Sequence, residues 1–164
     1  MKIAIISDIH DNLENLNKFL SWANENKLDL LICAGDVTNE ESVERLAAGF
    51  LKTIYLVAGN AELYDPKVLN DNKNVHYLGR TGVFSVAGYT IGLCHEPYFI
   101  NQLLEKRPDL EMIFYGHTHK PWIEEREGAK IINPGTLGGV FYRPTFALWD
   151  NSEQKIDLKL LELI

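Results

Sequence analysis

The chain has 164 residues, 46% of them hydrophobic, which suffices for one core, and we expect a single domain over residues 1–164. Its 23 acidic and 16 basic residues give a formal charge of -7, which argues against bulk nucleic-acid binding, because such binding needs a basic face. No apolar run approaches the roughly 18 residues of a membrane span, and the short apolar start meets Asp8 too early for a signal peptide. We therefore expect a cytoplasmic protein without a membrane partner, either a monomer or a homo-oligomer.

The first part of the chain alternates strand and helix signals. Apolar runs predict strands at 2–6, 28–34 and 53–58, and helical spacing predicts helices at 13–23 and 39–51 between them. The strands are followed by Asp8, Asp36 and Asn60, which are 28 and 24 residues apart, about the length of a βαβ unit. Right-handed crossovers place such strands parallel, with their carboxyl ends on one edge of the sheet.

The second part is dominated by hairpins. We expect strands at 83–86, 89–94, 112–115, 122–126, 130–133, 145–149 and 155–163, and one helix at 97–106. The early βαβ order followed by antiparallel hairpins predicts an α/β fold in which two mixed β-sheets pack face to face with helices outside.

Histidines and carboxylates cluster at the predicted strand ends. Asp8 and His10 lie two residues apart, so an extended backbone would point both side chains the same way. His117 and His119 have the same spacing, and Gly116 permits the tight turn that precedes them. This pattern is typical of a metal site.

Three further residues complete the predicted site. The Asp36 carboxylate has two oxygens and can bridge two ions, Asn60 offers a carbonyl oxygen, and His95 offers an imidazole nitrogen. This mixture suits manganese, iron, zinc, nickel or cobalt and disfavours magnesium or calcium alone. Two divalent ions bring four positive charges, which Asp8 and Asp36 reduce to two. A site that stays positive suits a small phosphate-ester substrate.

The ordered motifs Asp8-Ile9-His10, Gly35-Asp36, Gly59-Asn60, His95 and Gly116-His117-Thr118-His119 resemble those of the calcineurin-like metallophosphoesterases. The short length and the segment 133–136, Asn-Pro-Gly-Thr, are similar to the small YfcE or MJ0936-like phosphodiesterase branch, to which Vps29 is related. The resemblance implies a four-layer αββα sandwich. It also implies that Asp8, His10 and His119 bind one metal, that Asn60, His95 and His117 bind a second, and that Asp36 bridges them.

The resemblance further implies a phosphodiesterase in which a metal-bridging hydroxide attacks phosphorus, with Asp36, Asn60 and His95 as catalytic residues. We expect two divalent ions, manganese first, with nickel, cobalt, iron or zinc as alternatives. The rival hypothesis is a Vps29-like protein-interaction scaffold with weak or no catalysis. Retention of every ligand position favours the enzyme.

Two positions depart from the family pattern. Many members have histidine, a proton donor to the leaving group, where this chain has Ala61, so esters with good leaving groups should be preferred. The family usually has glycine where this chain has Glu96, whose charge beside the pocket would restrict substrates.

Other residues have a structural and a functional interpretation. An isolated aspartate after a strand is most often a turn or capping residue, and His76, outside every motif, is expected to be structural or solvated. Arg143 is either a phosphate contact or, by preference, a solvated side chain. Segment 133–136 is either a turn or a support for the wall of the metal site. Cys33 and Cys94 are expected to be buried free thiols.

Overall fold

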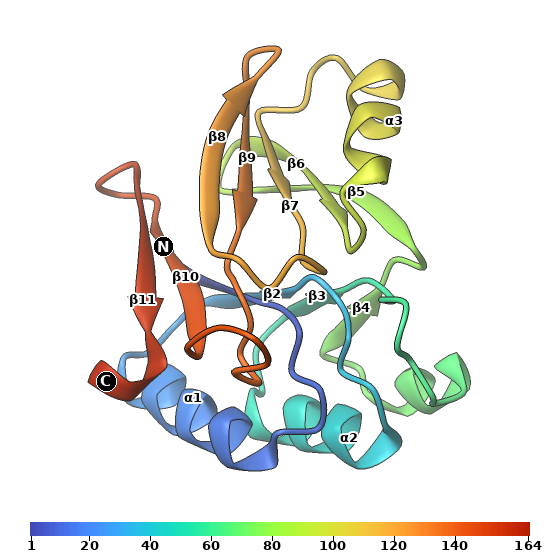
Figure 1. Cartoon of the computed structure of the whole chain (residues 1–164), viewed down its shortest axis with the longest axis vertical. Helices are drawn as coiled ribbons and strands as arrows, with labels where there is room; N and C mark the ends of the chain where they lie inside the picture. Colours follow the sequence, from blue (N-terminus) through green and yellow to red (C-terminus); the bar gives the residue numbers. More distant parts are fainter.

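The computed structural model describes residues 1–164, apart from the side chain of Asn70, and shows two mixed β-sheets stacked between helices (Figure 1). The first sheet, ordered β11-β10-β1-β2-β3-β4, contains β1 (Lys2–Ile6), β2 (Leu30–Cys33), β3 (Ile54–Leu56), β4 (Val75–Tyr77), β10 (Thr145–Asp150) and β11 (Lys155–Leu160). The second, ordered β5-β6-β7-β9-β8, contains β5 (Thr81–Val86), β6 (Tyr89–Cys94), β7 (Met112–Phe114), β8 (Trp122–Arg126) and β9 (Ala129–Asn133).

Helices cover the outer faces of both sheets. Helices α1 (Leu13–Glu25) and α2 (Glu40–Gly49) lie under the first sheet, and α3 (Tyr98–Lys106) lies against the second (Figure 1). Two short 3-10 helices, η1 (Pro66–Asp71) and η2 (Leu161–Leu163), complete the structure. The expected four-layer αββα sandwich is therefore confirmed.

The alternation of side chains along the strands produces the layers. In β1, Ile3 and Ile5 enter the core between the two sheets, whereas Ala4 and Ile6 enter the core between the first sheet and helices α1 and α2. A third core lies between α3 and the second sheet. Because both faces of β1 are covered, its residues 3–6 are all apolar and fully buried.

The parallel strands align their carboxyl ends. Ile6 of β1 is paired with Cys33 of β2, and Cys33 is paired with Leu56 of β3. The loops that follow these three strands therefore meet at one edge of the first sheet, as the spacing of the sequence predicts. Asn12 and Asn39 cap α1 and α2 by accepting bonds from backbone N–H groups three residues on.

The structure also corrects several predicted bounds. Strand β2 is Leu30–Cys33, so it begins two residues later and ends one residue earlier than its apolar run. Strand β3 is Ile54–Leu56, because the last two residues of its run belong to the loop at the sheet edge. The predicted last strand ends at Leu160 and continues as η2. Strand β4 was not predicted, since its three residues of mixed polarity carry no readable periodicity, and the six-residue 3-10 helix η1 was not predicted either. Among the described residues, no helix has the length and apolarity needed to cross a bilayer.

Candidate metal centre

The predicted ligand residues lie on loops whose backbone is not extended. Asp8, His10, Asp36, His117 and His119 all have positive φ, between 46° and 69°. The expectation that an extended backbone aligns Asp8 with His10 is therefore wrong, although their side chains do meet. Such left-handed residues are uncommon outside glycine and cluster at functional sites, where the surrounding structure holds them in place.

Three side chains form the first half of the cluster. The Nε2 atom of His119 lies 3.1 Å from Asp8 Oδ1, and His10 Nε2 lies 3.7 Å from the same oxygen. The two Nε2 atoms are 3.2 Å apart. One oxygen and two nitrogens thus point into a common space, which is the ligand set predicted for the first metal.

Three further side chains form the second half. Asn60 Oδ1 lies 3.1 Å from His95 Nε2 and 2.7 Å from His117 Nδ1. Asp36 lies between the two halves, because its Oδ2 atom is 3.2 Å from His95 Nε2 and 3.6 Å from His10 Nε2. All the predicted ligand residues are therefore brought together, from loops after β1, β2, β3, β6 and β7.

The tautomers of two histidines follow from their partners. His95 Nδ1 lies 2.7 Å from the Ala34 carbonyl oxygen, and His119 Nδ1 lies 3.0 Å from that of Val140. A carbonyl oxygen only accepts, so each Nδ1 carries the proton and donates it. In a neutral ring this leaves the Nε2 lone pair of each histidine facing the cluster, as a metal ligand requires.

Two carboxylates are buried at this centre. Asp8 is fully buried and Asp36 is 2% exposed. Burial raises the pKa of both carboxyl groups, but the nearby imidazoles of His10 and His119 at Asp8, and of His95 at Asp36, lower it by more, so each pKa lies below its usual range. Two buried negative charges require nearby positive charge.

The same interactions act on two histidines. Burial lowers the pKa of His95, but its hydrogen bond to Asp36 and the charges of Asp8 and Asp36 raise it above the ordinary value. The hydrogen bond to Asp8 raises the pKa of His119. Divalent cations between these carboxylates and imidazoles would neutralise the same buried charge, so this donor set fits a pair of metal ions.

Two loops are held together by Glu62, whose role was missed at the sequence level. Its carboxylate accepts hydrogen bonds from the backbone N–H groups of Val37, Thr38 and Gly59, at 3.3, 2.8 and 3.1 Å. It thereby fixes the segment after Asp36 to the segment before Asn60. The sequence signal was its position two residues after Asn60, and an acidic residue in a loop is ordinarily interpreted as solvated.

Segment 133–136 supports the wall of the site. Asn133 donates a hydrogen bond to the Gly116 carbonyl at 2.8 Å and another to Thr118 Oγ1 at 3.1 Å. Thr136 Oγ1 donates to the Asp8 carbonyl at 3.0 Å. Of the two interpretations offered by the sequence, the supporting one agrees with these bonds.

Two glycines allow the loops to approach closely. A Cβ atom on Gly116 would lie 1.9 Å from Ser7 Oγ and 2.8 Å from Asp8 Oδ2. On Gly59 it would lie 2.0 Å from Asp36 Oδ1. Both positions therefore require glycine for lack of space.

The two departures from the family pattern have different surroundings. The backbone N–H of Ala61 donates to Asp36 Oδ1 at 2.9 Å, so this residue still orients the carboxylate although its side chain has no proton to give. Glu96 is buried and forms an ion pair with Arg80 through Oε1. The pair offsets part of the charge of Glu96, and the expectation that this charge restricts substrates stays a prediction.

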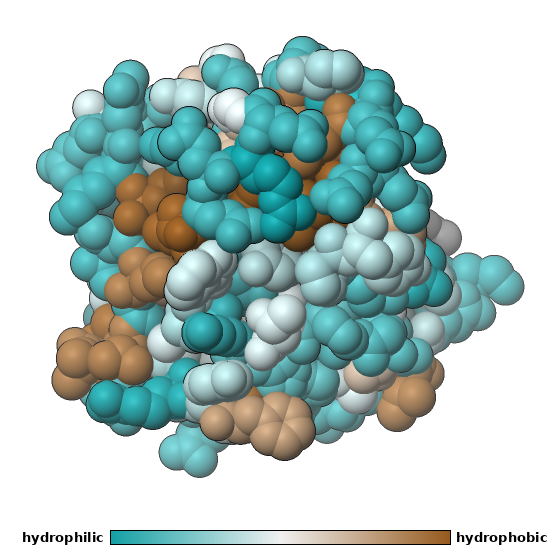
Figure 2. Space-filling view, turned by 45° about the horizontal axis from the view of Figure 1, so that its top comes forward, coloured by the Kyte–Doolittle hydropathy of each residue, from teal (hydrophilic) through white to brown (hydrophobic). Residues whose placement is uncertain are grey.

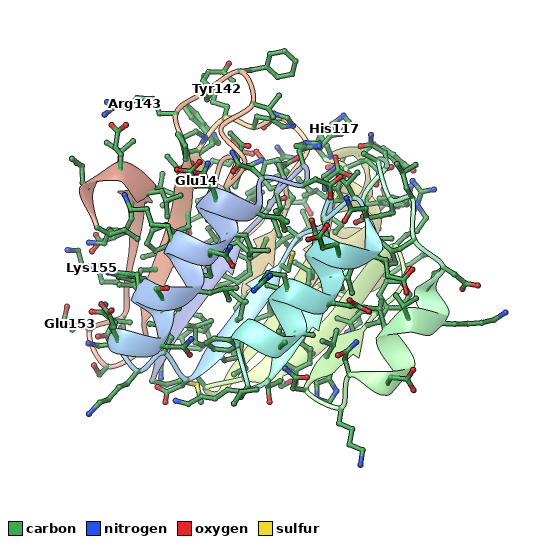
Figure 3. All side chains as sticks on the ribbon, turned by 90° about the horizontal axis from the view of Figure 1, so that it is seen from below. Glu14, His117, Tyr142, Arg143, Glu153 and Lys155 are labelled. Atoms are coloured by element: carbon green, nitrogen blue, oxygen red, sulfur yellow. The ribbon has the colours of Figure 1, made fainter. Side chains whose placement is uncertain are left out.

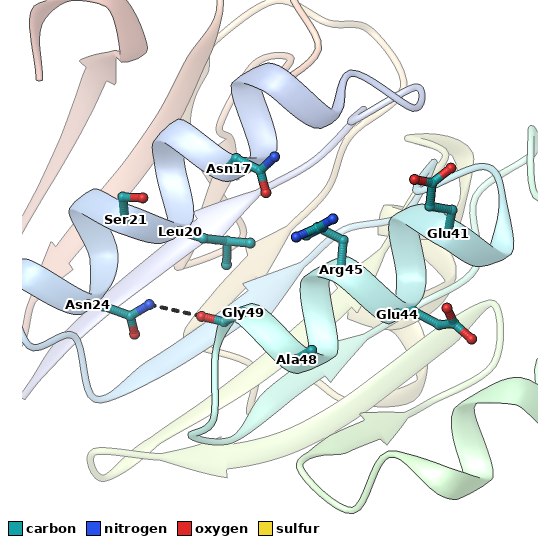
Figure 4. A pocket seen from close by; sticks show the side chains of 9 residues that line it. All are labelled: Asn17, Leu20, Ser21, Asn24, Glu41, Glu44, Arg45, Ala48 and Gly49. Atoms are coloured by element: carbon teal, nitrogen blue, oxygen red, sulfur yellow. Dashed lines mark hydrogen bonds between the residues drawn. The ribbon is translucent and has the colours of Figure 1, made fainter.

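The remaining candidates lie apart from the cluster. Arg143 forms an exposed ion pair with Glu162, and His76 is exposed on β4. A groove of about 690 Å³ lies between α1 and α2, lined by Asn17, Leu20, Ser21, Asn24, Glu41, Glu44, Arg45, Ala48 and Gly49 (Figure 4). None of the clustered residues lines this groove, so it is not the centre described above.

The comparisons with known proteins agree with this geometry. The two-sheet sandwich with histidines and carboxylates at the strand ends defines a metallophosphoesterase-type fold. The family model of the calcineurin-like phosphoesterase superfamily domain matches residues 1–154, and the chain belongs to this superfamily, whose members use divalent metals.

Individual relatives are distant. Phosphodiesterase MJ0936 of Methanocaldococcus jannaschii is 25% identical over 174 residues, covering 99% of this chain and all of that protein. The structure of an archaeal phosphodiesterase superimposes with a TM-score of 0.87 at 22% identity, covering 98% of this chain and 99% of the other. Vacuolar protein sorting 29 of Cryptosporidium parvum superimposes with a TM-score of 0.69 at 23% identity, covering 97% and 95%. The two structural likenesses establish a shared fold.

Proposed function

We propose that this chain is a dinuclear metal-dependent phosphodiesterase. The observation that carries the proposal is the position of Asp36, whose Oδ2 atom faces one histidine of each half of the cluster, at 3.2 and 3.6 Å. In this proposal, Asp8, His10 and His119 hold one ion, Asn60, His95 and His117 hold the other, and Asp36 contacts both. Manganese is the first candidate, before nickel, cobalt, iron and zinc.

When bound, two such ions lower the pKa of a water molecule and neutralise charge on the phosphoryl oxygens. The residues of the chain position these ions. The carbonyl groups of Ala34 and Val140 orient His95 and His119, and Glu62 fixes the loops that carry Asp36 and Asn60. Loss of such supporting contacts commonly weakens metal binding by about 10- to 100-fold.

The central test is Asp36→Asn, which keeps the shape of the side chain and an oxygen that can accept from the Ala61 N–H. We expect this variant to lose at least one bound ion, measured by mass spectrometry of the metal content. Hydrolysis of bis(p-nitrophenyl) phosphate should fall by at least about 100-fold, because one of two ions no longer contributes. Asp109→Asn, at an exposed aspartate that pairs with Arg107, is the matched control and should change neither quantity. Full activity of Asp36→Asn would contradict the proposed mechanism.

A protein-interaction scaffold is the second candidate, because Vps29 proteins share the fold and Ala61 cannot donate a proton. The two candidates differ in one experiment. The purified protein is loaded in turn with manganese, nickel, cobalt, zinc and magnesium and assayed on a panel of phosphate diesters and monoesters. Two bound ions without hydrolysis under any metal would favour the scaffold, whereas turnover would favour the enzyme and identify its preferred ester class.

A further inference from the structure

The loop between β9 and β10 exposes an aromatic ring beside the metal centre. Phe141 is 89% exposed and has a φ of 64°, a left-handed conformation that is a genuine outlier for a bulky side chain. The neighbouring Tyr142 is 48% exposed. Exposure of a large apolar ring on a strained backbone is unfavourable for folding, and such outliers point to functional sites.

The residues of this loop that precede Phe141 are anchored to the metal-ligand cluster. The N–H of Gly138 donates to the Asp8 carbonyl at 2.9 Å, and the Val140 carbonyl accepts from His119 Nδ1 at 3.0 Å. Gly138 also packs tightly, since a Cβ atom there would lie 2.4 Å from the Ile9 carbonyl oxygen. The position of Phe141 is therefore tied to two of the proposed metal ligands.

The ring of Phe141 lies directly beside one ligand. Its centroid is 5.5 Å from that of His119, and the ring planes are inclined by 38°. Figure 3 shows the adjacent Tyr142 at the same end of the molecule as His117, whereas Glu153 and Lys155 lie elsewhere. A phosphate held at the centre would thus have an exposed aromatic face next to it.

Other exposed hydrophobic residues do not combine these features. Leu63, which is 81% exposed, lies on the loop that carries Asn60, but its backbone φ is not positive. Figure 2 shows hydrophobic atoms at separate places on a mostly hydrophilic face, and the exposed Leu51 and Leu163 lie outside the loops that form the centre. Phe141 is distinguished by the combination of exposure, strained backbone and contact with a proposed metal ligand.

We propose that Phe141 is a specificity-determining residue whose exposed face stacks on an aromatic group of the phosphate ester. This inference rests on the proposed function, because it assumes that a phosphate binds at the metal centre. Aromatic rings stack favourably at centroid separations of 4.5 to 7 Å, and nucleobases stack on aromatic side chains regardless of sequence. Because the net charge of -7 disfavours binding to a polynucleotide, we assign the aromatic group to a small ester.

The aromatic group has two chemical sources, an aryl ester or the base of a nucleotide. Two ligand pairs separate them in calorimetric titrations of the manganese-loaded protein. Phenylphosphonate and methylphosphonate differ by an aryl ring in place of a methyl group, and uridine 5′-phosphate and ribose 5-phosphate differ by a nucleobase. We expect the aromatic member of at least one pair to bind roughly tenfold or more tightly, and the pair that shows this preference identifies the source.

Variants of Phe141 test whether the tighter binding of aromatic ligands depends on its ring. Phe141→Leu should remove it while leaving the binding of methylphosphonate unchanged, and Phe141→Trp should retain it. Leu51→Ala, at a residue that is 82% exposed and remote from the centre, is the control and should have no effect. A missing preference in both pairs, or one that survives in Phe141→Leu, would overturn the proposal.

Hydrolysis of bis(p-nitrophenyl) phosphate is measured separately in the same preparations. An aromatic preference that depends on Phe141 but is not accompanied by hydrolysis would reject the proposed function and leave this inference standing. Hydrolysis without such a preference would reject this inference alone.

Discussion

At the scale of single residues, the centre depends on how each side chain is oriented more than on which residues are present. His95 and His119 donate from Nδ1 to backbone carbonyls and therefore turn Nε2 toward the carboxylates. Asp36 is oriented by the N–H of Ala61, which is a backbone group and is kept whatever side chain follows Asn60. The chain can thus lose the family's histidine at position 61 without disturbing the carboxylate that joins the two halves.

This arrangement makes Ala61→His a test of leaving-group chemistry. The substitution restores a proton donor while the backbone bond to Asp36 remains. We expect kcat/KM for a diester with an alkyl leaving group to rise by about tenfold or more, because general-acid catalysis matters most for poor leaving groups. Hydrolysis of a p-nitrophenyl diester should change little. Ala61→Leu adds bulk without a proton donor and should not raise kcat/KM for either ester. An equal rise for both esters with Ala61→His would contradict a role of this histidine as a general acid.

At the scale of elements, the strands deliver the loops to one edge, and the loops are fixed by contacts across that edge. Ser7, the residue after β1, approaches the turn after β7 so closely that only glycine fits at position 116. Asn133, at the end of β9, holds the same turn through the Gly116 carbonyl. The turn that carries His117 and His119 is therefore positioned by two strands from different sheets.

We expect Gly116→Ala to damage both stability and metal binding. Its Cβ atom would lie 1.9 Å from Ser7 Oγ, and overpacking of this kind costs about 1 to 3 kcal/mol in the free energy of unfolding. Displacement of Asp8 should also weaken metal binding by about 10-fold or more. Urea denaturation and metal titration measure the two effects. Gly79→Ala is the comparison, because Gly79 has a φ of 75° but nothing within 4 Å of its Cβ position. That variant should lose some stability but no metal affinity.

At the scale of the whole molecule, three hydrophobic cores separate four layers, and the candidate metal centre lies where loops from both sheets meet. The core between α1, α2 and the first sheet contains Cys33, and the core beneath α3 contains Cys94. Both side chains are fully buried free thiols, as expected from the sequence.

The burial of these thiols predicts slow chemical modification. Thiolate is the reactive form, and burial raises the pKa of the Cys33 thiol above its ordinary value. In the native protein at pH 8, we expect a disulfide-exchange reagent to modify neither cysteine within minutes. In guanidinium chloride, both should react at once, which gives the total as an internal control. Rapid modification of the native protein would show that one of the cores opens readily.

The sequence by itself determined the fold class and the residues of the centre. Three apolar runs spaced as βαβ units indicated parallel strands, and the polar residues after them indicated a shared edge, because strand direction and crossover hand follow from local geometry. These predictions used only patterns among residues that are close along the chain. Short elements such as β4 escaped them, since Val75, His76 and Tyr77 are arranged as a strand by pairing with β3 and not by their own periodicity.

Only the tertiary structure decided how the residues meet. It placed Asp36 Oδ2 between two histidines, paired Glu96 with Arg80, and gave Glu62 three backbone partners. It also placed the exposed ring of Phe141 beside His119. Apart from the bond between Glu62 and Gly59, these contacts join segments that are distant along the chain. The contacts of Asp36, His119 and Phe141 also depend on left-handed loop backbones that no local pattern indicates. Residue identity is a property of the sequence, whereas the orientation of a side chain in a loop is imposed by what packs against it.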